Sequence, residues 1–354
     1  MQNNNSEQFI ELSHGSGGLK SYEILKEIRG VLKNVGKWKN TGDDGAVLDL
    51  NNHLVVRLPG KQPPGSATTR WSRLVFTTDA FIVDPIFFLG GDIGKIAMCG
   101  TINDLSVMGA KPLGISLSIV MEEGFPKKDL MKIIESINKV SKESGVPVVT
   151  GDTKVTERGK IDKIEITTSG VGLAEKVISN NGIQDGDAII VSGDLGEHTV
   201  ALLSQRFNYK TKVKSDSKPL NKELAKVGKY LNACKDPTRG GLAANLVEMA
   251  EKSGVKVVLD EGIVPYKKET IALSELLGVD VFAFASEGRF VASVSQENVN
   301  KVLKILRTFN KEAKVIGKAS KANKGEKVGV WLKTKLDSLR PIEMPRGKIV
   351  PRIC

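Results

Sequence analysis

Six aspartates of this 354-residue sequence lie beside glycine or at the end of strand-like runs: Asp43, Asp44, Asp79, Asp104, Asp152 and Asp236. Each alone is typical of a turn or a helix cap. Several carboxylates at strand ends of one domain would repel one another strongly unless a hard cation lay among them. Oxygen ligands without a Cys or His cluster favour Mg²⁺, which proteins usually hold together with substrate phosphates. Their joint recurrence therefore predicts a magnesium and phosphate site.

Two glycine-rich stretches suit the same chemistry. SHGSGG, at 13–18, offers successive backbone N–H groups to phosphate oxygens. It lacks the Lys-Ser/Thr of a P-loop, so a flexible linker remains an equal alternative. PTRGG, at 237–241, precedes an amphipathic pattern, and its helix N-terminus could face an anion or simply begin the helix.

The chain ends in MPRGKIVPRIC, with a cysteine as its last residue. A free terminal thiol is prone to oxidation, so its presence calls for a function. Three prolines, Pro341, Pro345 and Pro351, stiffen this tail, which could span roughly 45 Å at about 3.3 Å per residue. We expect a mobile, semi-rigid arm that reaches its own site or a partner's. The other two cysteines, Cys99 and Cys234, read as packed core thiols.

Composition limits the classes of protein. Hydrophobic residues make up 40% and charged residues 26%, and 354 residues suffice for two domains. No run approaches the ~20 apolar residues of a membrane span. The N-terminus has no secretory pattern and the three cysteines are sparse, so we expect a cytoplasmic protein. The net charge of +11 comes with 5% aromatics and no nucleic-acid motif, which favours a solvated basic surface over nucleic-acid binding. Attraction of an acidic partner or a nucleotide remains the alternative.

The elements that must position these residues alternate along the chain. Strands are predicted at 53–58, 73–81, 113–121, 146–151 and 163–172, with helices at 92–108 and 127–145. After a boundary near 174–180 a second set follows. Its predicted strands are 187–192, 255–260, 289–295 and 313–317, and its predicted helices are 198–206, 220–231, 241–253, 269–277 and 296–309. Residues 59–72 read as an inserted loop. The pattern indicates two α/β (α+β) domains in series.

The order of these motifs resembles one family. SHGSGG, DDGAV, TTDAFIVDP, TINDLSVMGAKP, VTGDTKV, SGDLGEHT, DPTRGG, SEG and a terminal PRIC follow one another across nearly the whole chain. This series resembles the HypE family of NiFe-hydrogenase maturation factors, which are carbamoyl dehydratases. The wider superfamily includes aminoimidazole ribonucleotide synthetase and selenophosphate synthetase. The terminal PRIC distinguishes the HypE family from these relatives.

The resemblance implies a two-domain aminoimidazole ribonucleotide synthetase-like fold. It implies an N-terminal segment at 1–40, an N-terminal ATP/Mg-binding and dimerisation domain at 41–175, a C-terminal α/β domain at 176–338 and a mobile tail at 339–354. The N-terminal sheets of two copies are expected to pair across a homodimer. The other implied partners are the carbamoyltransferase HypF and the HypC–HypD iron scaffold complex.

The implied reaction gives the tail its function. A carbamoyl group on the Cys354 sulfur is phosphorylated by ATP with Mg²⁺, and loss of phosphate leaves a thiocyanate that can deliver cyanide to iron. Glu287, in SEG, and Lys154, in GDTKV, match polar residues around the modified cysteine. Glu287 is expected to accept the amide proton, and Lys154 to stabilise charge on the oxygen or phosphate. A local salt bridge is the alternative role for both.

The remaining residues are carried over by motif. The six aspartates match acidic nucleotide–magnesium positions, with Asp44, Asp79, Asp104 and Asp236 as the metal set. The other implied nucleotide-binding residues are His14, Gly15, Gly17, Gly18, Asn103, Thr238, Arg239 and Gly240. The chain departs from the family at Ser286, where Asn is usual, and at GEHT (196–199), where GDHG is usual.

Two other functions use part of these features. A superfamily phosphotransferase acting on a free small molecule explains the acids and glycines but leaves PRIC unused. A non-catalytic scaffold with a tethering or redox-sensing thiol leaves the acids unexplained.

Overall fold

The computed structural model describes residues 18–31, 38–40, 43–50, 73–322, 325–346, 350 and 352–354. The predictions for His14, Gly15, Gly17, the strand at 53–58 and the loop at 59–72 lie outside these residues. Within the described part, no helix has the length and apolar character that a membrane crossing requires.

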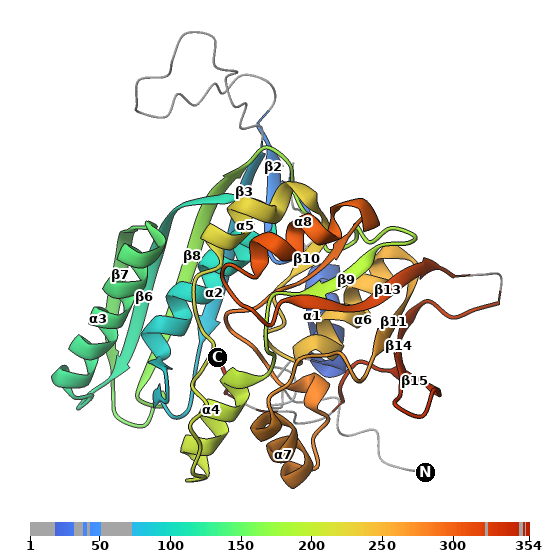
Figure 1. Cartoon of the computed structure of the whole chain (residues 1–354). Coiled ribbons are helices and arrows are strands. Elements are labelled where there is room, and N and C mark those ends of the chain that lie inside the picture. Colours follow the sequence, from blue (N-terminus) through green and yellow to red (C-terminus); the bar gives the residue numbers. More distant parts are fainter. Residues whose placement is uncertain are drawn as a thin grey trace, which may run out of the picture.

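A six-stranded sheet forms the N-terminal unit, on the left of Figure 1. Its order is β1 (Trp38–Lys39), β2 (Ala46–Asp49), β3 (Arg73–Phe81), β8 (Ile164–Ala174), β6 (Lys111–Glu122) and β7 (Val148–Thr156). Helices α2 (Ile93–Val107) and α3 (Lys127–Ser144) pack on one face. Nearly every residue of α2 is buried, and α3 ends at Gly145 in the left-handed conformation (φ 77°) that glycine favours. Among the elements of this half that the structure describes, the predicted strands at 73–81, 113–121 and 163–172 and both predicted helices are confirmed within two residues. The strand predicted at 146–151 runs from Val148 to Thr156.

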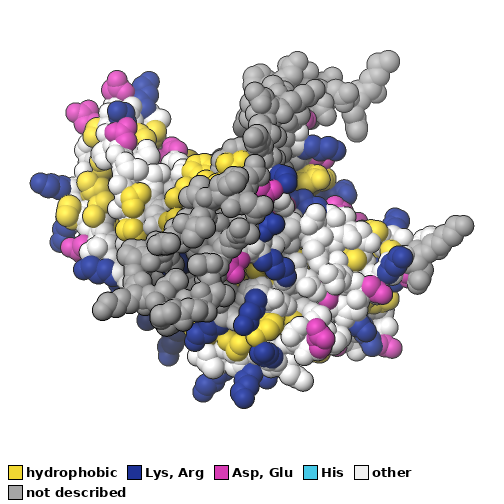
Figure 2. Space-filling model, turned by 90° about the horizontal axis from the view of Figure 1, so that it is seen from above, with side chains coloured by type: hydrophobic (Ala, Val, Ile, Leu, Met, Phe, Trp, Pro, Cys, Tyr) yellow, Lys and Arg dark blue, Asp and Glu magenta, His cyan; other side chains and the backbone are white. Residues whose placement is uncertain are grey.

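Register separates the two faces of this sheet. Asp79 pairs with Thr168, which lies under α2 and donates a hydrogen bond to the Ala97 carbonyl. The neighbouring row runs from Ala80 through Thr167 and Ser118 to Asp152, so it points to the opposite face. No helix of the described residues packs on that face, which is called the uncovered face below. Its large exposed side chains include Phe76 on β3, and the edge strand β7 exposes Val149 and Val155. Seen from above, hydrophobic side chains lie at the surface on the side of the molecule that carries β6 and β7 (Figure 2).

A seven-stranded sheet forms the C-terminal unit. Its order is β10 (Leu231–Lys235), β12 (Val291–Val294), β9 (Ala188–Val191), β13 (Lys314–Lys321), β11 (Val255–Asp260), β14 (Gly329–Lys333) and β15 (Leu339–Ile342). Helices α5 (Asn221–Val227) and α8 (Gln296–Leu306) share one hydrophobic cluster with β9, β10 and β12. Helix α6 (Gly241–Ser253) packs in a second cluster with β9, β11 and β14. The shorter elements complete the chain: α1 (Leu19–Val31), β4 (Phe87–Phe88), β5 (Gly91–Asp92), α4 (Glu197–Arg206), η3 (Gly228–Tyr230), α7 (Lys268–Leu277) and η4 (Val281–Ala283).

Two stretches of this half differ from the sequence prediction. The helix expected at 220–231 ends at Val227, because Leu231 and the residues after it are needed as strand β10 beside β12. The tail expected from residue 339 begins with strand β15, whose Pro341 pairs with Trp331. Proline is tolerated there because β15 is the edge of the sheet, where its missing N–H leaves no ladder bond unmade.

The end of the tail lies between the two units. Val350 and Ile353 are buried in a cluster that joins α2, α3 and the N-terminal sheet to residues of α4 and α7. Figure 1 shows the C-terminus between α2 and α4. The described end of the tail is thus docked, with Cys354 half-buried, instead of extending into solvent as an arm.

Candidate active site

Four of the predicted aspartates come together at the junction of the two units. Asp79 ends β3, Asp104 lies on α2, Asp236 follows β10 and Asp44 precedes β2. Thr77 Oγ1 lies 2.9 Å from both Asp104 Oδ2 and the Asp44 carbonyl oxygen, within hydrogen-bond distance of each, which ties β3 to two of these acids. Strand β3 is therefore the element that gathers them.

Their carboxylates destabilise one another. Burial first, and then Asp236, Asp79 and Asp44, raise the pKa of Asp104 well above its usual value. Burial and then Asp44 raise the pKa of Asp236 to about 7. These shifts report the repulsion that the sequence predicts. A cluster of this kind favours a positive ligand.

Lysines already neutralise part of the cluster, which the sequence analysis missed. Lys235 Nζ lies 2.7 Å from Asp44 Oδ1 and 3.2 Å from Glu248 Oε2. Asp43 is held apart from the other acids: its carboxylate accepts from Ser179 Oγ at 2.6 Å and pairs with Lys252 at 3.3 Å. Lys235 stands directly before Asp236 in CKDPTRGG, so the motif did contain the signal.

The terminal cysteine faces these acids. Burial first, and then the Glu287 carboxylate, raise the pKa of the Cys354 thiol, while Arg239 opposes the shift. Arg239 Nη2 lies 3.6 Å from Asp79 Oδ1, and Cys354 is the largest influence that raises the pKa of Arg239. The sequence prediction that PRIC belongs with the acid cluster thus has a geometric counterpart inside one chain.

Glu287 is 1% exposed, and its Oε1 has no hydrogen-bond partner in the structure. Burial, followed by Asp236 and Asp79, raises its pKa well above the usual value. A carboxylate with a raised pKa binds a proton more strongly, which suits a general base. An unpaired buried carboxylate oxygen costs free energy, so its position indicates a functional demand.

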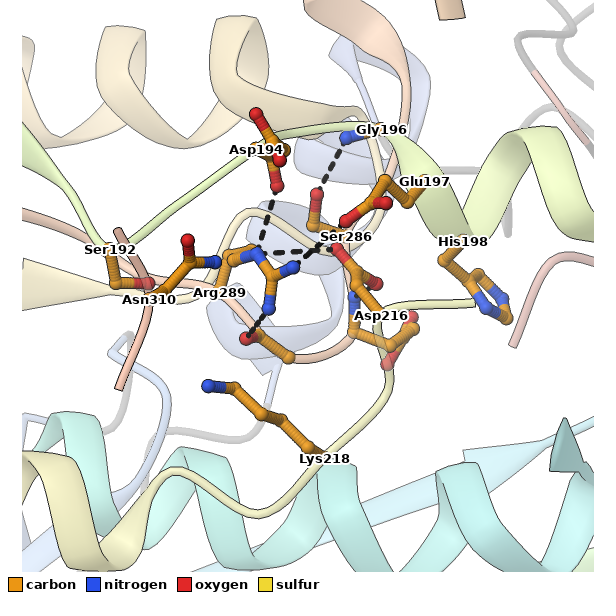
Figure 3. Close-up of polar contacts among 12 residues, drawn as sticks. Ser192, Asp194, Gly196, Glu197, His198, Asp216, Lys218, Ser286, Arg289 and Asn310 are labelled. Carbon is orange, nitrogen blue, oxygen red and sulfur yellow. Dashed lines mark hydrogen bonds and ion pairs between the residues drawn. The ribbon is translucent and has the colours of Figure 1, made fainter. Parts of the chain in front are cut away.

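A buried ion-pair network holds the loop that carries Glu287 (Figure 3). Arg289 Nη2 pairs with Glu197 Oε2 at 2.8 Å, and its Nε donates to the Asp194 carbonyl at 2.9 Å. Asp216 Oδ1 accepts from the Glu287 backbone N–H at 2.9 Å. Ser286 Oγ accepts from the Gly196 N–H at 2.8 Å, so Ser286 contacts the GEHT motif at its unsubstituted glycine.

Asn103 does not present its amide to the acid cluster. Its Nδ2 donates to the carbonyls of Lys218 and Glu287 at 3.2 and 3.1 Å, and its Oδ1 accepts from the Leu220 N–H at 2.8 Å. The side chain therefore positions the Glu287 loop from α2. The predicted role in nucleotide binding has no direct contact to support it.

The two glycine-rich stretches meet. A Cβ added to Gly240 would lie 3.4 Å from the Gly18 nitrogen, and Gly240 adopts a left-handed φ of 78° at the start of α6. Thr238 accepts from the Gly241 N–H in the same turn, at 2.8 Å. The Leu19 N–H at the start of α1 donates to the Pro345 carbonyl at 3.0 Å. The tail therefore passes the glycine-rich corner on its way to the acid cluster.

Asp152 and Lys154 lie elsewhere. Both are exposed on the edge strand β7, where Lys154 Nζ pairs with Asp152 Oδ2 at 3.3 Å. Their register row belongs to the uncovered face of the sheet, opposite Asp79 and Asp104. Within one chain the structure does not bring them to Cys354 or Glu287.

The acid cluster fits Mg²⁺ better than a metal held by protein ligands alone. Among the described residues, no three acidic, His or Cys side chains stand close enough to form a ready metal site. Mg²⁺ commonly uses one or two carboxylates and completes its shell with water and phosphate. Asp44 Oδ2 is buried and has no hydrogen-bond partner. The atoms with which the four aspartates could bind a metal are all carboxylate oxygens. Asp44, Asp79, Asp104 and Asp236 are therefore suitable ligands in the presence of nucleotide.

Two family models match the chain. The model described as AIR synthase related protein, N-terminal domain, matches residues 42–174, and the one described as AIR synthase related protein, C-terminal domain, matches residues 184–329. The carbamoyl dehydratase HypE of Cupriavidus necator is 39% identical over 98% of this chain and 95% of its own length.

Solved structures agree with these matches. A HypE in complex with ATP has a TM-score of 0.77 at 32% identity, over 98% of this chain and 100% of the other. A HypE–HypF complex has a TM-score of 0.77 at 33% identity, over 91% of this chain and 99% of the other.

Proposed function

The chain belongs to the HypE carbamoyl dehydratases, within the AIR synthase related proteins, and on this premise we propose that it dehydrates a carbamoyl group on its own Cys354 to a thiocyanate. The observation that carries the proposal is the docked terminus. Cys354 lies where the charges of Glu287, Arg239 and Asp79 all act on its thiol. A thiol that only tethered the chain would need none of these neighbours.

ATP supplies the phosphoryl group that turns the carbamoyl oxygen into a phosphate leaving group. The ATP complex of a HypE with 32% identity supports nucleotide binding by this chain. The meeting point of Gly18 and Gly240 is the place that we propose for the phosphates. Mg²⁺ would neutralise the phosphates, held by Asp44, Asp79, Asp104 and Asp236. Positioning and charge stabilisation then supply most of the catalysis.

Each step of the reaction balances. The carbonyl oxygen of Cys-S-CO-NH₂ attacks the γ-phosphorus and displaces ADP, while one N–H proton moves to Glu287 Oε1. The C–O bond then breaks, the second N–H proton leaves on the phosphate as HPO₄²⁻, and Cys-S-C≡N remains. Glu287 then releases the first proton to solvent. The net change is carbamoyl cysteine and ATP to thiocyanate, ADP, phosphate and a proton. Because Glu287 is buried, the same site keeps water from the activated intermediate.

Arg239 is the cation that this chain already places at the reacting end. Its pairing with Asp79 and its response to Cys354 put a positive charge where the carbamoyl oxygen gains phosphate. Arginine keeps this charge throughout the reaction, because it does not deprotonate in proteins.

We further propose a homodimer through the N-terminal sheets. The uncovered face and the exposed edge strand β7 need a cover, and Val149 and Val155 are 64% and 66% exposed. Lys154 lies on that face and cannot reach Glu287 of its own chain. Its proposed charge-stabilising role therefore requires the second copy to bring it to the site.

HypF and the HypC–HypD complex are the proposed protein partners. A HypE–HypF complex structure with 33% identity supports the first, which would deliver the carbamoyl group. An iron scaffold is required to accept the cyanide, since thiocyanate on Cys354 is an intermediate carrier.

Mass spectrometry of the C-terminal peptide tests the proposal. Incubation with the carbamoyltransferase should add one carbamoyl group to the peptide, and ATP should then remove the mass of one water. Cys354→Ala should fold and bind Mg²⁺-ATP but yield no thiocyanate. A carbamoylated wild-type peptide that persists with bound nucleotide refutes the dehydration. Normal turnover of a free small substrate by Cys354→Ala would instead establish a phosphotransferase.

A further inference from the structure

The last three residues are held through their backbone. The Ile82 N–H donates to the Cys354 carbonyl at 3.3 Å, and the Asp84 N–H donates to the Arg352 carbonyl at 3.2 Å. Donors two residues apart meet acceptors two residues apart in reverse order, so the terminus runs antiparallel to the segment that follows β3. Arg352 has a left-handed φ of 56°, so the terminus lies beside this segment as a turn and an irregular end and not as a strand.

His198 takes the carbonyl between these two. Its Nε2 lies 2.8 Å from the Ile353 oxygen, and its Nδ1 lies 2.8 Å from Ser215 Oγ. A carbonyl only accepts, so Nε2 carries the hydrogen and Nδ1 accepts from the serine hydroxyl in the neutral ring. The main-chain oxygens of all three terminal residues thus have donors outside the tail.

Side chains add selectivity for the residue types. Arg352 Nη2 pairs with Asp162 Oδ2 at 2.6 Å, and Arg206 Nη2 donates to the Arg352 carbonyl at 3.0 Å. Ile353 is 4% exposed within the hydrophobic cluster. The Cys354 side chain, in contrast, faces the acid cluster. The site is therefore specific for the sequence Arg-Ile-Cys.

The His198 ring packs against Phe88, which lies edge-on to it with ring centroids 5.2 Å apart. Glu197, the preceding residue of α4, points the other way into its ion pair with Arg289 (Figure 3). Helix α4 therefore connects the loop of Glu287 to the carbonyl next to Cys354.

We propose that the segment 82–84, Asp162, His198 and Arg206 form a binding site for a C-terminal Arg-Ile-Cys peptide, in which His198 is the positioning residue that sets where the Cys354 sulfur lies relative to Glu287. The consequence for dehydration rests on the proposed function above. The binding itself does not.

Alkylation of Cys354 by iodoacetamide tests the binding without ATP or a carbamoyl group. Cys99 and Cys234 are fully buried and serve as internal folding controls in the same digest. His198→Leu should raise the alkylation rate of Cys354 at least tenfold. His198→Gln should keep the wild-type rate, because a glutamine amide can donate to the same carbonyl. Equal rates in wild type and His198→Leu overturn the proposal.

A charge exchange covers the case in which His198→Leu unfolds and exposes Cys99 and Cys234. Asp162→Arg should expose Cys354, and the double variant Asp162→Arg with Arg352→Asp should restore protection. Failure of the double variant to protect, with buried controls intact, also overturns the binding site.

Dehydration of the carbamoylated chain tests the positioning role. His198→Leu should slow the ATP-dependent loss of water at least tenfold with the KM for ATP unchanged, and His198→Gln should restore it. Faster alkylation with an unchanged dehydration rate refutes positioning by His198. If the wild-type carbamoyl peptide loses no water at all, the proposed function fails, while the alkylation result still decides the binding site.

Discussion

The two faces of the N-terminal sheet carry acidic side chains in opposite environments. On the face under α2, burial raises the pKa of Asp79, and Asp44 adds to the rise while Arg239 opposes it. On the other face Asp152 is exposed, and the Thr153 N–H and Lys154 lower its pKa. Adjacent rows of one strand pairing thus separate a buried carboxylate, whose charge is unfavourable, from an exposed carboxylate that is already neutralised. Only the buried carboxylate needs a positive ligand within the chain.

The tail reinforces this difference. It docks on the side where α2 and α4 lie and places its thiol beside the acid cluster. On the uncovered face, β3 exposes Phe76, and β7 carries the exposed pair of Asp152 and Lys154. One face therefore binds the chain's own terminus, and the other is available to a second copy.

The largest effect should come from Glu287. Glu287→Gln keeps the side-chain volume but removes the base, so dehydration should fall by roughly 10²–10⁴-fold. ATP binding should persist. Glu275→Gln, an exposed glutamate on α7, is the matched control and should leave the rate unchanged. The measured quantity is the rate of water loss from the carbamoylated peptide. If Glu287→Gln keeps more than a tenth of the wild-type rate, another residue is the general base.

A smaller loss is expected at Asp104. Asp104→Asn removes one of four mutually repelling carboxylates, so use of Mg²⁺-ATP should weaken by roughly 10–100-fold. The free protein should be as stable as wild type or more stable by about 1 kcal/mol, because a buried charge is lost. Asp337→Asn, in an exposed ion pair, is the control. Magnesium titrations of ATP turnover and urea denaturation separate the two effects, and unchanged magnesium dependence would remove Asp104 from the site.

For Lys154 on the uncovered face we expect a smaller loss of turnover, which mixed dimers can test directly. Lys154→Met should lower turnover by roughly 10–100-fold, and Lys160→Met, in the exposed turn after β7, should not. Mixing Lys154→Met with Glu287→Gln chains should restore about a quarter of wild-type turnover, since one site of each mixed dimer then has both groups. No restoration on mixing, or a monomer by light scattering at micromolar concentration, contradicts the role across a dimer.

The sequence predicted the fold and the acidic residues, but not which distant groups the polar side chains around them bind. Asp79, Asp104 and Asp236 are local to motifs, and each lies where its motif indicated. Asn103 bonds to backbone 115 and 184 residues away, so nothing near it in sequence shows that its amide is already used. His198 similarly meets a carbonyl 155 residues away. Strand β14 and the edge strand β15 beside it escaped prediction because strands this short depend on their partners rather than on their own pattern.

The smallest predicted effect is the pH dependence that His198, beside the docked terminus, gives to the free energy of unfolding. Burial lowers the pKa of His198 below its usual 6.5, against the opposing effects of the Ile353 carbonyl and Asp216, while Lys95 lowers it further. The unfolded chain therefore binds the proton more readily, and the stabilisation is complete above pH 6.5 and is lost as pH falls through that value toward the folded pKa.

His198→Gln lacks this proton but retains the donor. The free energy of unfolding in urea should therefore fall more steeply for wild type than for His198→Gln between pH 7.5 and 5.5. Below pH 6.5 the difference should grow by about 1.4 kcal/mol for each pH unit until the folded pKa is reached. The acids with raised pKa titrate in both proteins and cancel in the comparison. Lys154→Met, on the uncovered face, should follow the wild-type curve. Parallel curves for wild type and His198→Gln would mean that the ring is protonated as easily in the folded protein as in the unfolded chain, so that the docked terminus does not shield it from solvent.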